Sequence, residues 1–135
     1  MDYKKYYVNS YYGVAGEEQM KAEIAANGPI ACGIEASANL EENYKGGIWR
    51  QYIKEPELNH EISVVGWRTD PDSQEQFWIV RNSWGNYWGD YGFFYLPIGP
   101  PQINLGLQTD CIAGVPDFDQ APGAKQILSE QSFIQ

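Results

Sequence analysis

The chain is poor in the residues that metal and cofactor sites need. Its 135 residues include one histidine and two cysteines. Standard zinc sites combine about four closely spaced His, Cys or acidic ligands, so the sequence predicts no metal ion and no cofactor. The glycine-rich segment GNYWGDYG has neither a lysine nor a following helical pattern, which argues against a phosphate-binding loop.

Positive charge and long apolar runs are scarce too. Nine Lys and Arg face eighteen Asp and Glu, giving a formal net charge of −9. This balance disfavours nucleic acid and anionic membranes as partners. No apolar run approaches membrane-spanning length, so we expect no membrane span. The opening MDYKKYYVNS has no apolar segment behind its basic residues, so we also expect no signal peptide.

The chain is instead rich in aromatic residues, glycine and short β-prone segments. Residues 17–26 predict a helix, with Met20, Ile24 and Ala25 on one face and NGP ending it. SANLEEN predicts a helical turn, and YKGGIW a glycine turn that leads into a short strand. The strand candidates are IACGIEA, HEISVVGWR, QFWIVRN and GFFYLP. These elements predict an α+β domain: an antiparallel sheet curled into a partial barrel, with one main helix.

The end of the chain follows a different pattern. From Val115 onward the hydrophobic periodicity is lost. We therefore expect one domain over residues 1–118 and an extended C-terminal tail over residues 119–135.

His60 is the first candidate for chemistry. Asn59 precedes it, and Asn82 follows 22 residues later in RNSWGNYWG. An Asn amide can accept the imidazole N–H and fix the ring, which leaves the other nitrogen to face a thiol. The alternative is that His60 is structural and that the neighbouring tryptophans are core or interface aromatics.

These residues carry a family resemblance. NHEISVVGW and FWIVRNSWGNYWGDYGFF resemble the second half of papain-family cysteine peptidases. The upstream AEIAANGPIACGIEA and YKGGIW and the downstream INLGLQTDCIAG resemble the same half in order. The late DCIAGVP resembles the cathepsin X (cathepsin Z) subgroup. The resemblance implies that His60 is the catalytic imidazole and that Asn82 orients it. It also implies that Trp84 shields this pair and that Trp88 lines the leaving-group side of the cleft.

The resemblance also shows what is missing. In the family, the thiol and the oxyanion-hole Gln lie on the first domain, and this chain resembles the second. Cys32 lies inside a predicted strand and Cys111 follows Asp110, so neither suits a helix-activated thiolate. By the subgroup resemblance, Cys32 and Cys111 pair as a disulfide. In a reducing compartment they would be buried thiols instead.

Glu61 departs from the family, whose members usually carry a small or apolar residue beside the histidine. By resemblance this position lies on a wall of a substrate pocket. A carboxylate there could select a basic side chain and act on the charge of His60. It could equally mark a site that has lost its catalytic duty, or simply face solvent.

Two functions follow from these residues. The chain is either the His/Asn half of a cathepsin X/Z-like peptidase or a non-catalytic module that binds through an aromatic face and its tail. The first needs a Cys-bearing papain-type N-terminal half as partner and cleaves peptides, with C-terminal trimming implied by the subgroup. The second needs another protein subunit. The resemblance implies a lysosomal, endosomal or extracellular location.

Overall fold

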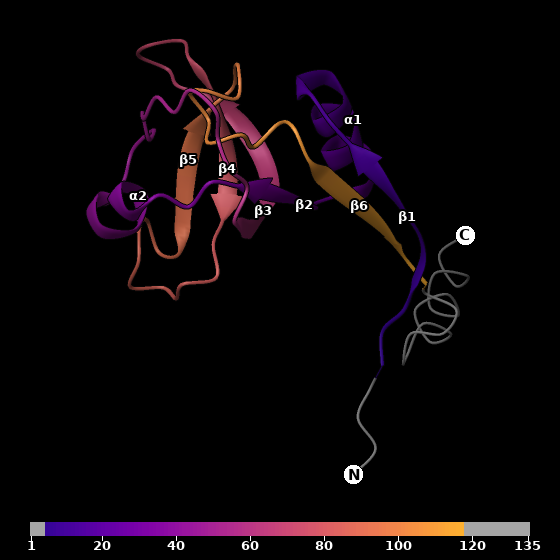
Figure 1. Cartoon of the computed structure of the whole chain (residues 1–135). Coiled ribbons are helices and arrows are strands. Elements are labelled where there is room, and N and C mark those ends of the chain that lie inside the picture. Colours follow the sequence, from indigo (N-terminus) through magenta and orange to yellow (C-terminus); the bar gives the residue numbers. More distant parts are fainter. Residues whose placement is uncertain (1–4, 118–135) are drawn as a thin grey trace, which may run out of the picture. The chain divides into compact units, whose positions relative to one another are not determined.

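The computed structural model describes residues 5–117 of the chain, in two compact units (Figure 1). The larger unit spans residues 13–113. The smaller one consists, within the described part, of residues 5–12 and 114–117. The predicted tail over residues 119–135 lies outside the described residues.

An antiparallel sheet forms the frame of the larger unit. Its hydrogen-bonded order is β6-β2-β3-β4-β5. The bounds of these strands are β2 Ile30–Ile34, β3 His60–Thr69, β4 Gln76–Arg81, β5 Phe93–Pro97 and β6 Cys111–Pro116. Each of the four segments predicted as strands overlaps one of β2 to β5, and the predicted α+β fold is confirmed.

The smaller unit contains a strand that the sequence did not predict. Residues 8–12 of β1 (Val8–Val14) pair with the end of β6, and the backbone N–H of Asp117 donates to the carbonyl of Tyr7 at 2.9 Å. Side chains along β1 are exposed on both faces up to Tyr12. A strand that buries neither face shows no alternation of apolar and polar residues, and this alternation is the signal from which strands are predicted.

Two helices complete the larger unit. α1 (Glu17–Asn27) buries Met20 and Ile24, while Ala25, predicted on the same face, is exposed. The helix ends at Gly28, whose φ of 101° suits glycine and whose N–H bonds to the carbonyl of Ile24. α2 (Ala38–Asn43) begins after Ser37, whose hydroxyl accepts the N–H of Leu40 at 3.1 Å. No described helix is both long and apolar enough to span a membrane.

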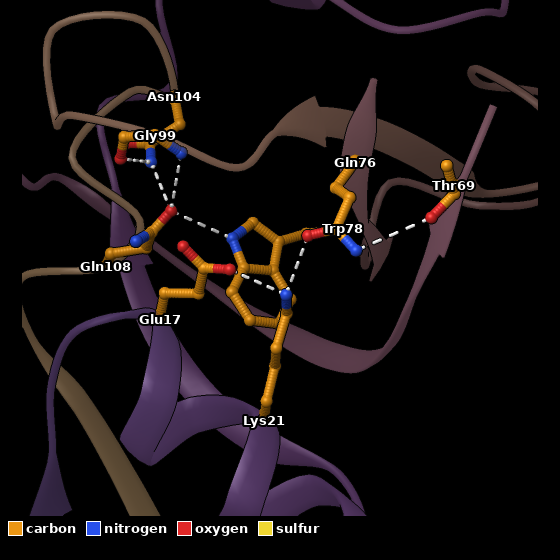
Figure 2. A network of polar contacts seen from close by, with 8 residues as sticks. All are labelled: Glu17, Lys21, Thr69, Gln76, Trp78, Gly99, Asn104 and Gln108. Carbon is orange, nitrogen blue, oxygen red and sulfur yellow. Dashed lines mark hydrogen bonds and ion pairs between the residues drawn. The ribbon is translucent and has the colours of Figure 1, made fainter. Parts of the chain in front are cut away.

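The Gln108 side chain fastens the loop between β5 and β6 to the sheet (Figure 2). Its Oε1 accepts three hydrogen bonds: from Trp78 Nε1 at 3.0 Å, from the Gly99 N–H at 3.1 Å and from Asn104 Nδ2 at 2.9 Å. Trp78 and Asn104 are fully buried. Buried N–H donors without an acceptor are costly, so these three hydrogen bonds hold the loop in position where it leads into β6.

The predicted disulfide is confirmed. Cys32 of β2 and Cys111 of β6 are directly opposite partners in the sheet, and their sulfurs are bonded across a sequence separation of 79 residues. The sequence contains no other cysteine, so this chain carries no free thiol.

Candidate active site

Sheet pairing brings His60 and Asn82 together. β3 and β4 are antiparallel, with Ser63 opposite Arg81, so the start of β3 lies beside the end of β4. His60 is the first residue of β3 and Asn82 follows the last residue of β4. The imidazole Nε2 and the Asn82 Oδ1 are 2.9 Å apart.

The hydrogen bonds around Asn82 determine the tautomer of His60. The Asn82 Oδ1 also accepts the backbone N–H of Ser83 at 2.8 Å, and an N–H can only donate. The atom at this position is therefore the amide oxygen, and the His60 Nε2 must carry the proton that it shares with it. Nδ1 is then the unprotonated nitrogen of the neutral ring, and no described residue hydrogen-bonds to it. An imidazole held in this way is ready to accept a proton at Nδ1.

Aromatic rings cover this hydrogen bond. Trp84 stacks on the imidazole, with ring centroids 4.9 Å apart and an interplanar angle of 27°. The edge of Trp88 meets Trp84 at 4.7 Å, and its Nε1 donates to the carbonyl of Glu41 at 2.9 Å. Asn82 itself is only 8% exposed. Exclusion of water strengthens the bond between ring and amide. Trp78, in contrast, is fully buried, as expected for a tryptophan that belongs to the core and not to the site.

The glycines of this segment shape a tight turn. Gly89 has a φ of 60°, and a Cβ there would lie 2.6 Å from the Phe93 carbonyl oxygen and 3.1 Å from the Tyr44 ring. Only glycine fits so close to another backbone. The glycine-rich pattern therefore serves the turn that carries Trp84 and Trp88.

Two tyrosines brace the same turn. The hydroxyl of Tyr95 donates to the Asp90 carboxylate at 2.6 Å, and this hydrogen bond is the main cause that raises the pKa of Tyr95 to about 12. Burial raises the pKa of Tyr44, whose ring packs against Trp88. Both phenols therefore stay protonated at neutral pH.

Asn59 and Glu61, on either side of His60, have different environments. The Asn59 Oδ1 accepts the N–H of Ala36 at 2.8 Å, and its own N–H donates to the carbonyl of Ile34 at 2.9 Å. Asn59 thus anchors the chain where β3 begins. Glu61 is exposed, and its carboxylate has no hydrogen bond or ion pair with any residue from 5 to 117.

Several supporting groups could not be found from local sequence. The N–H of Ser83 and the carbonyl of Glu41 are backbone groups, whose roles depend on the fold and not on residue type.

Asn82 Nδ2 is buried without a hydrogen-bond partner in the described part of the chain. Within that part, no group of three His, Cys, Asp or Glu residues could hold a metal ion.

Comparison with known proteins agrees with this geometry. The family model described as "Papain family cysteine protease" matches residues 1–113. A cathepsin Z from Onchocerca volvulus is 40% identical over 116 residues, covering 82% of this chain and 37% of the relative. A cathepsin C from Schistosoma mansoni is 32% identical, covering 77% of this chain and 25% of the relative. The bromelain protease from Ananas comosus, solved with the E64 inhibitor, superposes with a TM-score of 0.71 at 26% identity, covering 81% of this chain and 51% of that structure.

The chain spans between a quarter and about two fifths of the length of these two cathepsins. The matched part contains the paired His60 and Asn82 with their tryptophan cover. By the family model and the cathepsin Z match, the chain belongs to the papain family of cysteine proteases.

Proposed function

We propose that this chain is the His/Asn half of a papain-type cysteine peptidase and acts with a partner half that supplies the Cys and the oxyanion-hole Gln. The observation that carries the proposal is the His60–Asn82 pair, held under Trp84 with Nδ1 open, in a chain whose two cysteines are bonded to each other. His60 is positioned to accept a proton from a thiol, and this chain contains no free thiol.

In this mechanism His60 moves one proton in each half of the reaction. Nδ1 takes the proton of the partner's thiol, and the thiolate attacks the peptide carbonyl carbon. The imidazolium then donates that proton to the leaving amine as the C–N bond breaks, which leaves a thioester. Next, Nδ1 accepts a proton from water as the water attacks the thioester, and it returns this proton to the sulfur when the acid leaves. Throughout, Asn82 holds Nε2–H and keeps the ring in position.

The finer features of the proposal rest on similarity to cathepsin Z. They are trimming of peptides from the C-terminus and a lysosomal, endosomal or extracellular location. The disulfide supports an oxidising compartment during folding, because such bonds persist there and are rare in the cytosol.

Treatment of the native preparation with an epoxide electrophile that alkylates activated thiolates tests the proposal. Mass spectrometry then identifies the labelled residue. We expect the label on a cysteine of the Cys-bearing half, outside the 135 residues of this chain. A preparation that remains unlabelled, while papain labels normally in parallel, contradicts the proposal.

The second candidate function is a non-catalytic binding module. It is favoured by exposed tyrosines in the smaller unit, with Tyr6 74% and Tyr11 73% exposed. Tyrosine is enriched at protein interfaces. In this case the native preparation contains a structural partner, or further copies of this chain, and no reactive thiol.

A further inference from the structure

The chain around the start of β1 contains a short segment whose tyrosines are arranged symmetrically about its centre. Residues 6–12 have the sequence YYVNSYY, with two tyrosines on each side of VNS and Asn9 in the middle. Two antiparallel copies of this segment, aligned at Asn9, therefore place tyrosine opposite tyrosine. A two-fold symmetric contact between identical chains requires such self-complementarity. We call residues 6–12 the tyrosine segment.

The tyrosine segment forms an edge that nothing in its sequence protects. Within the described chain, β1 has one neighbouring strand, β6 (Figure 1). Natural edge strands usually carry charged residues or proline, which prevent pairing with another chain. The tyrosine segment has neither, although 20% of the residues of the chain are charged, and all its side chains are exposed. It therefore presents an edge suited to the addition of a further strand.

One hydrogen bond determines which backbone groups of the segment point to this edge. The carbonyl of Tyr7 accepts the N–H of Asp117, directly after β6, at 2.9 Å. Backbone groups of successive residues in a strand point to opposite sides. Those of Asn9 therefore also point toward β6, whereas those of Val8 and Ser10 point to the open edge. An added strand can form hydrogen bonds only with the groups that point to this edge.

The symmetric register satisfies these backbone groups. With Asn9 opposite Asn9 of a second copy, Val8 is opposite Ser10, and both residues point to the shared edge. In antiparallel pairing each such pair exchanges two hydrogen bonds, one in each direction. A shift of one residue would place groups that point to the edge opposite groups that point toward β6, and the hydrogen bonds would be lost.

The same register pairs the aromatic side chains. Tyr7 is opposite Tyr11 of the second copy, and Tyr6 is opposite Tyr12. Opposite residues share a face of the sheet, and aromatic pairs of this kind stabilise strand pairing. A shift of two residues, which would restore the backbone hydrogen bonds, leaves no tyrosine opposite another. Backbone and side chains therefore select one register together.

The exposed area of the segment fits a weak dimer. Tyr7 is 47% and Val8 60% exposed, beside the more exposed Tyr6 and Tyr11. A covered aromatic side chain buries about 150–250 Å², so the segment can bury about 500 Å² per copy and about 1,000 Å² in the dimer. Specific interfaces begin at about 1,000 Å², and we therefore expect a Kd of about 10–100 µM.

We propose that this chain forms a symmetric dimer in which the tyrosine segments of two copies pair as antiparallel strands, in the strand order β6-β1-β1-β6. The pairing uses no residue of the His60 site. It is therefore independent of whether the chain is a peptidase half or a binding module, and thiol labelling decides between those two functions separately.

Sedimentation of the full chain over concentrations from about 1 µM to about 500 µM tests the dimer. Tyr11→Ser removes two tyrosine pairs from each dimer and should raise the Kd about 10-fold or more. Tyr52→Ser is the matched control, because Tyr52 is 71% exposed outside the segment, and it should leave the Kd unchanged. A chain that stays monomeric over this range, or a dimer that Tyr11→Ser does not weaken, overturns the proposal.

An introduced cysteine tests the register. The native chain has no free thiol, so Asn9→Cys provides a single one. Opposite residues that do not exchange hydrogen bonds have Cα atoms about 4.5 Å apart, a distance that a disulfide can bridge. Under mild oxidation we expect covalent dimers from Asn9→Cys and few from Asn86→Cys, at an exposed position outside the segment. Equal cross-linking of the two variants would count against the symmetric register.

Hydrogen exchange distinguishes a second copy from other occupants of the edge. The N–H groups of Val8 and Ser10 form hydrogen bonds in the dimer, so their protection should rise with the concentration of the chain. Protection that is the same at all concentrations would show that another segment of this chain, or the Cys-bearing half, covers the edge. That result would also overturn the proposal.

Discussion

Replacing Asn82 by leucine should release the imidazole of His60 from its single tautomer. In the native chain Nε2–H donates to the Asn82 Oδ1 at 2.9 Å; Asn82 is 8% exposed, and Trp84 stacks on the imidazole. A hydrogen bond of this kind contributes roughly 0.5–1.5 kcal/mol. At the upper end, which suits a water-excluded site, its loss changes the tautomer ratio about 10-fold.

Nitrogen-15 NMR measures the tautomer directly, because His60 is the only histidine in the chain. At about pH 9 a free imidazole is neutral, so the spectrum shows which ring nitrogen carries the proton. We expect nearly all Nε2–H in the native protein and a mixture in Asn82→Leu. Asn86→Ala, at an exposed position of the same turn, is the control and should keep the native spectrum. Native protein with Nδ1–H, or an unchanged ratio in Asn82→Leu, would refute this account of the site.

Three further predictions concern the support of the site. Reduction of the Cys32–Cys111 bond, which closes a loop of about 80 residues, should lower the free energy of unfolding by about 4 kcal/mol, and an unchanged urea midpoint would contradict this. Gln108→Met removes the acceptor of three N–H groups and should cost about 3 kcal/mol in the same assay, whereas a cost below about 0.5 kcal/mol would show that the groups find other acceptors. The folded pKa of Tyr95, about 12, exceeds the unfolded value of about 10, so its contribution to stability is present below pH 10 and is lost as the pH rises to 12. Asp90→Asn should lower that pKa in a phenolate absorbance titration, and an identical titration would count against the Tyr95–Asp90 hydrogen bond as its cause.

The sheet was predictable where buried apolar residues alternate with exposed polar ones; β6, whose exposed Ile112 is apolar, was not predicted. In β3, Ile62 and Val64 are buried while Glu61 is exposed, and this alternation is visible in the sequence. It is absent from β1, which buries only its last residue, Val14, and the strand was missed. Ala25 was predicted on the same face of α1 as Met20 and Ile24, which are buried, but it is exposed; a side chain this small gains little from burial.

The candidate site was predictable in its residues but not in its geometry. His60 and Asn82 were chosen for their chemistry and for a family resemblance, yet the tautomer depends on the backbone of Ser83, which no residue pattern specifies.

Peptide hydrolysis by the native preparation, with His60 either intact or replaced by alanine, tests the central claim most directly. The account predicts turnover with the native chain and a loss of at least about 1000-fold in kcat/KM with His60→Ala, since the proton donor and acceptor is then removed. Turnover that survives His60→Ala, or no turnover in a preparation whose His60 still shows the Nε2–H tautomer, would contradict the claim that this chain is the working half of a cysteine peptidase.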